Sequence, residues 1–131
     1  MQEMFKKVNE VLDRYPSVLL CIVFGSAISG KSLAASDIDI AIAEAQPLEP
    51  DLRLDMMEAF ASALGREVDL VDLMADQGLI LQQAMCSGKI VRNKDKSLYA
   101  NLISRMLLSQ ADMMPYYDRI LRERRERFLN G

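Results

Sequence analysis

An unbroken apolar run, Val18–Phe24, restricts the fold of this chain more than any other feature, and Gly25 ends it. The run favours β structure, and a strand that is apolar on both faces belongs in a sheet covered on both sides, or nearly so. Residues 2–14 precede it with apolar side chains at helical spacing, and Pro16 ends that helix. The sequence therefore predicts an amphipathic helix that leads into a buried strand.

A second strand is predicted at residues 36–43, and it alternates. Its three isoleucines take one face, whereas Asp37, Asp39 and Ala41 take the other. A third strand, residues 67–73, alternates in the same way and places Asp69 opposite the face of its apolar neighbours. Each of these strands thus has one face for a core and one face that carries carboxylates.

The rest of the chain continues this alternation of helices and strands. The order predicts an α/β or α+β domain, with a small mixed sheet flanked by helices and a helical C-terminal part. We expect the 131 residues to form one domain, with its core at about 1–92 and a C-terminal helical segment at about 95–128. The other expected elements are a short helix within 27–35, a helix at 51–64 with Asp51 as N-cap and Gly65 past its end, a helix at 76–86, an edge strand at 89–92 and a helix from residue 96 that Pro115 kinks.

The absence of histidine excludes several kinds of active site. A Ser-His-Asp or Cys-His nucleophile needs an imidazole, as does His-ligated zinc, and two cysteines cannot form an all-cysteine zinc site. Acid and base chemistry therefore falls to Asp, Glu, Lys, Tyr or Cys. Cys21 and Cys86 are expected to be small buried side chains rather than a disulfide.

Charge and hydropathy restrict the partners. The chain has 16 basic and 19 acidic residues, a net charge of −3, and stable direct DNA binding is not expected because such binders are normally basic. A phosphate-bearing ligand is still compatible, since one site can be locally positive or hold a metal. The longest apolar run is far shorter than the roughly 20 residues of a membrane span, and the first residues lack signal-peptide features. We expect a cytoplasmic protein without membrane contact.

The acidic residues of the alternating strands are the candidates for chemistry. Asp37 and Asp39 point the same way, roughly 6–7 Å apart by strand rise, and their repulsion is removed by a divalent cation such as Mg²⁺. If the strand of Asp69 is a neighbour, three carboxylates converge, which suits a two-metal site for phosphoryl or nucleotidyl transfer. The alternatives are a solvated acidic strand face for the pair and a half-exposed strand residue for Asp69. Asp72 is out of phase with Asp69 and is expected at the surface or facing a loop.

Gly25 and Ser26 are the candidates for phosphate binding. A glycine at the end of a buried strand lets the backbone approach a phosphate closely, and a helix that starts there offers free N–H groups. Ser26 adds a hydroxyl donor. As a dipeptide alone, the pair is equally compatible with an ordinary turn, so its weight comes from its spacing to the aspartates.

That spacing is Gly25-Ser26, ten residues, Asp37-Ile38-Asp39, and later Asp69 on a strand. The pattern resembles the DNA polymerase β-like nucleotidyltransferase superfamily. The short length is similar to the minimal nucleotidyltransferases (MNT), which are usually encoded beside HEPN-domain toxins and act as their antitoxins. The resemblance covers roughly residues 18–73 by motif.

The resemblance implies a polymerase-β-like core and a role for each motif residue. It implies that Asp37, Asp39 and Asp69 bind Mg²⁺ and are catalytic, with Asp69 helping to activate the acceptor hydroxyl. It also implies that nucleotide phosphates are held by Gly25 and Ser26, to which we add Ser36 and Lys31. Family members often carry a basic residue where this chain has Ser29, just before Gly30. Lys31 is a candidate for the missing positive charge, or a solvated loop lysine.

The implied activity is Mg²⁺-dependent transfer of AMP from ATP to a hydroxyl, a tyrosine of a cognate HEPN toxin, which makes the protein an antitoxin. One alternative is an antitoxin that neutralises its partner by binding alone. Another is a small-molecule nucleotidyltransferase of the aminoglycoside type. The segment 98–128 is rich in Met, Tyr and Arg and is predicted to bind the partner protein, unless it packs on its own sheet.

Overall fold

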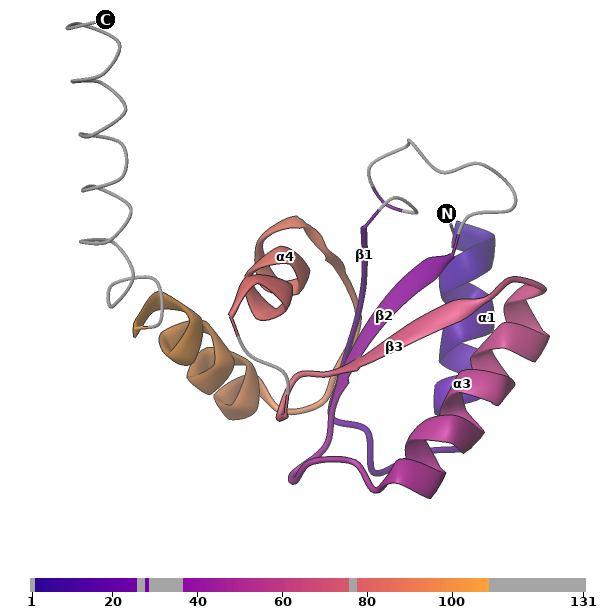
Figure 1. Ribbon diagram of the computed structural model, residues 1–131, viewed down its shortest axis with the longest axis horizontal. Coiled ribbons are helices and arrows are strands. Elements are labelled where there is room, and N and C mark those ends of the chain that lie inside the picture. Colours follow the sequence, from indigo (N-terminus) through magenta and orange to yellow (C-terminus); the bar gives the residue numbers. More distant parts are fainter. Residues whose placement is uncertain (1, 26–27, 29–36, 76–77, 109–131) are drawn as a thin grey trace, which may run out of the picture.

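The computed structural model of this chain describes residues 2–25, 28, 37–75 and 78–108, and the structural statements below concern these residues. Helices and strands alternate along them as the sequence predicts (Figure 1). The elements are α1 (Gln2–Leu12), β1 (Leu20–Phe24), β2 (Ile38–Ala43), α3 (Pro50–Leu64), β3 (Val68–Asp72), α4 (Leu79–Ser87) and β4 (Lys89–Asn93), followed by helical residues 96–108.

Within the described residues the strands form one mixed sheet in the order β3-β2-β1-β4. β1 pairs antiparallel with both β2 and β4, whereas β2 pairs parallel with β3. A parallel pair needs a crossover, and α3 provides it. The predicted small mixed sheet, with the last strand at an edge, is confirmed.

Helices cover both faces of the sheet (Figure 1). The isoleucines of β2 pack with α1 and α3 around Phe60 on one face, and this cluster includes Val68 and Leu70 of β3. On the other face, Ala41 and Val71 pack with α4 and the helical residues 96–108. All five residues of β1 are buried, as expected for a strand that is apolar on both sides.

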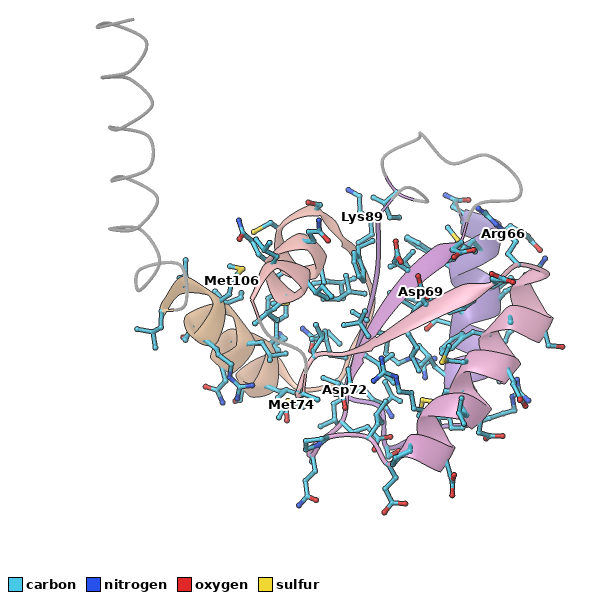
Figure 2. All side chains as sticks on the ribbon, in the orientation of Figure 1. Arg66, Asp69, Asp72, Met74, Lys89 and Met106 are labelled. Carbon is cyan, nitrogen blue, oxygen red and sulfur yellow. The ribbon has the colours of Figure 1, made fainter. Side chains whose placement is uncertain are left out.

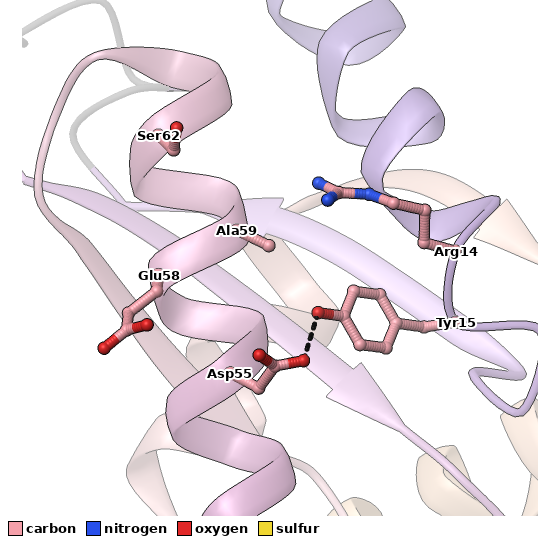
Figure 3. Close-up of a pocket in the computed structure, with 6 residues that line it drawn as sticks. All are labelled: Arg14, Tyr15, Asp55, Glu58, Ala59 and Ser62. Carbon is pink, nitrogen blue, oxygen red and sulfur yellow. Dashed lines mark hydrogen bonds between the residues drawn. The ribbon is translucent and has the colours of Figure 1, made fainter.

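Two contacts fix α1 to its neighbours. From β4, the Arg92 guanidinium donates to Asn9 Oδ1 at 3.1 Å and to Asp13 Oδ1 at 2.9 Å. From the turn after α1, the Tyr15 hydroxyl donates to Asp55 Oδ2 of α3 at 2.7 Å (Figure 3). The contact between Tyr15 and Asp55 lines a hollow of about 530 Å³.

Two local predictions need correction. Helix α3 begins at Pro50 with Glu49 as N-cap, and Asp51 lies inside its first turn, because proline suits the first helical position. Gly65 ends this helix with φ +66°, as predicted. Cys86 is exposed and only Cys21 is buried, although both are free thiols as expected. The α4 side chains that point into the core are Leu81 and Ala84.

The prediction that Asp72 lies at the surface is wrong, whereas its alternative, that Asp72 faces a loop, is confirmed. Asp72 is 2% exposed, and it shares the face of β3 that carries Leu70 into the core. Its carboxylate accepts hydrogen bonds from the backbone N–H of Leu48 at 2.7 Å and of Met74 at 2.9 Å, and Figure 2 shows it beside Met74. A buried carboxylate needs such donors, so Asp72 fastens the chain before α3 to the end of β3.

Several expectations fall outside the described residues. These are the short helix within 27–35, of which only Ile28 is described, the kink at Pro115 and the C-terminal segment beyond residue 108. In the part of the chain that the structure describes, no helix is long and apolar enough to cross a membrane.

Candidate active site

The strand directions bring the acidic residues and Gly25 to one edge of the sheet. Because β1 runs antiparallel to β2 and β3 runs parallel to it, β1 ends where β2 and β3 begin. In the register of the sheet, Phe24 lies opposite Asp39, and Asp39 lies opposite Asp69. The condition set from the sequence, that the two aspartate-bearing strands are neighbours, is met.

Asp39 and Asp69 lie on the face of the sheet that α4 partly covers. Ala41 and Val71 follow them by two positions on the same face and are buried under the helices. Asp39 is half-buried, whereas Asp69 and Asp37 are exposed. The covered part of this face therefore ends where the two carboxylates begin, and solvent reaches them.

Gly25 lies directly against the carboxylate of Asp39. Its φ is +80°, and a Cβ added at this position would be 2.2 Å from Asp39 Oδ2. Both observations require glycine, since a side chain would be strained and would collide with the carboxylate. The close approach of the backbone at the end of β1, which the sequence predicts for Gly25, is present here.

The electrostatics of the site reflect its crowded carboxylates. Burial raises the pKa of Asp39, and the negative charges of Asp69 and then Asp37 raise it further. A bound cation would reverse this effect, because it favours the ionised form. Within the described residues, no three acidic or cysteine side chains are arranged around one point as in a formed metal site. The oxygen donors fit Mg²⁺, which needs only one or two carboxylates when phosphates supply further ligands.

Two hollows open on either side of Asp39, and both are lined by Asp39, Phe24 and Gln83. The first, the Gly25 hollow, has a volume of about 640 Å³ and is also lined by Gly25, Ile28, Ser87 and Lys89. The second, the Arg53 hollow, has a volume of about 350 Å³ and is also lined by Arg53, Asp69, Leu70, Val71 and Ile80.

The third predicted acid is placed differently. Asp37 precedes β2 and lines a separate hollow of about 340 Å³, next to α3, together with Asp69. Asp69 thus shares one hollow with each of the other two aspartates. The remaining predicted residues, Ser26, Lys31 and Ser36, lie outside the described residues.

Three further side chains at this edge were not predicted from the sequence. Arg53 reaches it from α3 and donates from Nη2 to the Leu70 carbonyl at 2.6 Å. Gln83 comes from α4, and Lys89 is the first residue of β4, paired with Val23. No local pattern marks them, because they reach the site only through the crossover and through the pairing of β4 with β1.

The comparisons with known proteins agree with this geometry. A protein adenylyltransferase, MntA of Shewanella oneidensis, is 35% identical over 97 residues, which are 72% of this chain and 70% of that protein. A crystal structure of a toxin–antitoxin with AMP-PNP is 31% identical with a TM-score of 0.74, over 89% of this chain and 98% of that one. A chain from the solved complex of a tri-AMPylated Shewanella oneidensis HEPN toxin with MNT antitoxin is 31% identical with a TM-score of 0.69, over 92% of this chain and 98% of that one.

The family profile described as polymerase beta, nucleotidyltransferase, matches residues 6–97. This stretch runs from α1 through β4 and contains every strand described above. The motif order, the mixed sheet and the relatives point the same way, and the chain therefore belongs to the polymerase-β nucleotidyltransferase family.

Proposed function

We propose that this protein transfers AMP from ATP to a tyrosine hydroxyl of a cognate HEPN toxin and thereby acts as an antitoxin. The observation that carries the proposal is the in-register pair of Asp39 and Asp69, with the Gly25 backbone against the Asp39 carboxylate. The relatives support the donor and the acceptor. MntA is a protein adenylyltransferase, and the solved complexes hold AMP-PNP in one case and a tri-AMPylated HEPN toxin in another.

Asp37, Asp39 and Asp69 are the proposed residues for holding Mg²⁺. The ion, when bound, neutralises the negative charge that develops on the transferring phosphoryl group. Burial, and then the negative charges of Asp69 and Asp37, raise the pKa of Asp39, and this supports the assignment because a bound cation would offset both effects. Its remaining coordination positions suit phosphate oxygens and water, as Mg²⁺ usually requires.

The two hollows suggest a division between donor and acceptor. We assign the triphosphate to the Gly25 hollow, where the backbone is accessible and Ser26 follows in the chain. The acceptor tyrosine is assigned to the Arg53 hollow, which is lined by the apolar side chain of Ile80 and by the carboxylate-bearing Asp69. In the reaction the acceptor oxygen bonds to the α-phosphorus, the bond from that phosphorus to pyrophosphate breaks, and the acceptor proton passes to the Asp69 carboxylate.

The direct test is intact-mass analysis of the product of the neighbouring gene after incubation with this protein, ATP and Mg²⁺. We expect mass increases of whole AMP units that disappear with EDTA or with Asp39→Asn. If Asp39→Asn still neutralises the toxin without modifying it, the protein acts by binding alone. If no protein acceptor is modified but an aminoglycoside is, the small-molecule alternative replaces the proposal.

A second variant tests the acceptor side. Asp69→Asn keeps the shape of the side chain and removes its charge, so it should lower the transfer rate more than the affinity for ATP. Removal of a general base typically costs about 10²–10⁴-fold. Asp51→Asn, in the exposed first turn of α3, makes the same chemical change at the opposite edge and should leave the rate at the parent value. Transfer by Asp69→Asn at the parent rate would show that Asp69 is not needed.

A further inference from the structure

The described part of the site and its proposed substrate are both negatively charged, because the site carries carboxylates and the substrate carries phosphates. Asp37, Asp39 and Asp69 are all acidic, and Asp69 lies opposite Asp39 in the register of the sheet. Family members often supply a positive charge within the motif loop, but this chain has Ser29 in that place. A cationic side chain from elsewhere in the fold would therefore add to the positive charge that Mg²⁺ and the loop lysine, Lys31, offer to a triphosphate.

Lys89 occupies the position where such a side chain is needed. It is the first residue of β4 and pairs with Val23, one residue before the Phe24-Gly25 end of β1. It lines the Gly25 hollow together with Gly25 and Asp39, and Figure 2 shows it at the edge of the sheet between α4 and β1. Its side chain is exposed.

The Lys89 ammonium has no partner among the described residues. It forms no hydrogen bond or ion pair with them, in contrast to the cations that follow in β4 and directly after it. Arg92 is held by Asn9 and Asp13, and Lys94 donates to the Pro16 carbonyl. Arg53 donates to the Leu70 carbonyl and lines the other hollow. Lys89 is the cationic residue that lines the Gly25 hollow in this part of the chain.

The backbone next to Lys89 is tightly fixed. A Cβ added at Gly88 would be 2.3 Å from Ile22 Cγ2 and 2.4 Å from the Ala84 carbonyl oxygen. The chain therefore passes directly between β1 and the end of α4, and it enters β4 at one defined place. Because the backbone at Gly88 is held in this way, the flexible side chain of Lys89 starts from a fixed point beside the Gly25 hollow.

We propose that Lys89 binds the phosphate oxygens of the nucleotide and so supplies, from β4, the positive charge that the motif loop lacks at Ser29. The proposal rests on the assignment of ATP to the Gly25 hollow made above. Gln83 and Ser87 of α4 line the same hollow and place further polar groups beside the lysine. A lysine is a compact point charge with three donors, which suits a phosphate whose oxygens can be reached from several directions.

The test compares Lys89→Gln, Lys89→Arg and the control Lys96→Gln by calorimetric titration with ATP and Mg²⁺, without acceptor. Lys96 is exposed and lies past the far end of β4, so its variant makes the same change away from the hollow. Loss of a charge-assisted hydrogen bond predicts about a ten- to hundred-fold weaker affinity for Lys89→Gln. Lys89→Arg should recover most of it, and Lys96→Gln should match the parent.

Inorganic tripolyphosphate provides a second measurement that a purely structural role of Lys89 would not change. It should compete with ATP in the parent protein and lose most of this competition in Lys89→Gln, while the thermal midpoint stays unchanged. Parent-like ATP affinity in Lys89→Gln, alongside a loss in Asp39→Asn, would overturn the role of Lys89 and leave the proposed function standing. If the parent itself binds no ATP and transfers no AMP, the proposed function fails together with this inference.

Discussion

Gly25→Ala should damage the active site far more than it destabilises the fold. The added methyl would lie 2.2 Å from Asp39 Oδ2, whereas the shortest usual distance between non-bonded carbon and oxygen atoms is about 3.3 Å. The carboxylate must therefore move by about 1 Å, a displacement that can cost about 10²-fold in rate. The left-handed φ of +80° adds about 1–2 kcal/mol of instability.

The matched control is Gly65→Ala at the end of α3. Its φ is +66°, and a Cβ there would meet no atom within 4 Å, so it introduces similar backbone strain without a collision. Gly65→Ala should lose about 1–2 kcal/mol in urea denaturation, and Gly25→Ala should lose this amount plus the cost of the collision. AMP transfer, measured in single turnovers, should fall about a hundred-fold only in Gly25→Ala.

A double variant isolates the collision itself. In an Asp39→Ala background the methyl of Gly25→Ala meets no carboxylate, so its stability cost should shrink to the backbone term, and the two substitutions should not be additive. Parent-like transfer by Gly25→Ala would refute the close contact between Gly25 and Asp39. An equal loss of transfer in Gly65→Ala would show that general instability, rather than the collision, lowers the rate.

Three further predictions follow from the described contacts and from the sequence. Because the pKa of Asp39 is raised above its ordinary value of 3.8, the folded metal-free protein binds this proton more tightly than the unfolded chain, and ionisation at neutral pH lowers stability. Asp39→Asn should therefore raise the thermal midpoint at pH 7 in EDTA. The gain should vanish as the pH falls through the raised pKa of Asp39 towards 3.8. An unchanged midpoint at pH 7 would contradict the unfavourable burial and repulsion of the Asp39 carboxylate. Asp72→Ala leaves two backbone N–H groups without their acceptor and should cost roughly 2–4 kcal/mol of stability in urea denaturation. The protein that remains folded should bind ATP with parent-like affinity. A loss of stability below about 0.5 kcal/mol would contradict this role. Truncation after Gln110 should abolish co-purification with the toxin while ATP binding is retained; an insoluble product would assign the segment to the core.

The strands and their faces were predictable because a period of two is a local property of the sequence. The alternation around Ile38 and Ile40 placed Asp39 correctly, and the same reasoning placed Asp69. Asp72 shows the limit of this approach. Being out of phase with Asp69 puts it on the core face, and it is stable there only because N–H groups of Leu48 and Met74 reach it. The path of the chain that delivers these donors is not encoded in the strand pattern.

Lys89 was not predicted for a related reason. A lysine that opens a short edge strand resembles any solvated lysine in sequence, and only the pairing of β4 with β1 brings it to Gly25. The same holds for Arg53, which reaches the site because α3 lies along β3. Residues that share a strand with the motif were therefore accessible from sequence, whereas residues delivered by the crossover or the edge strand were not.

The parallel pairing of β2 with β3 also restricts how the length of this chain can change during evolution. Asp39 and Asp69 are opposite each other in one register only. If β3 slips by one residue, every side chain moves to the other face. Asp69 would then enter the core beside Phe60, where Val68 and Leu70 now pack. Burial of an unpaired carboxylate is strongly unfavourable, so single-residue insertions between Gly65 and Val68 should be rare among functional descendants of this sequence.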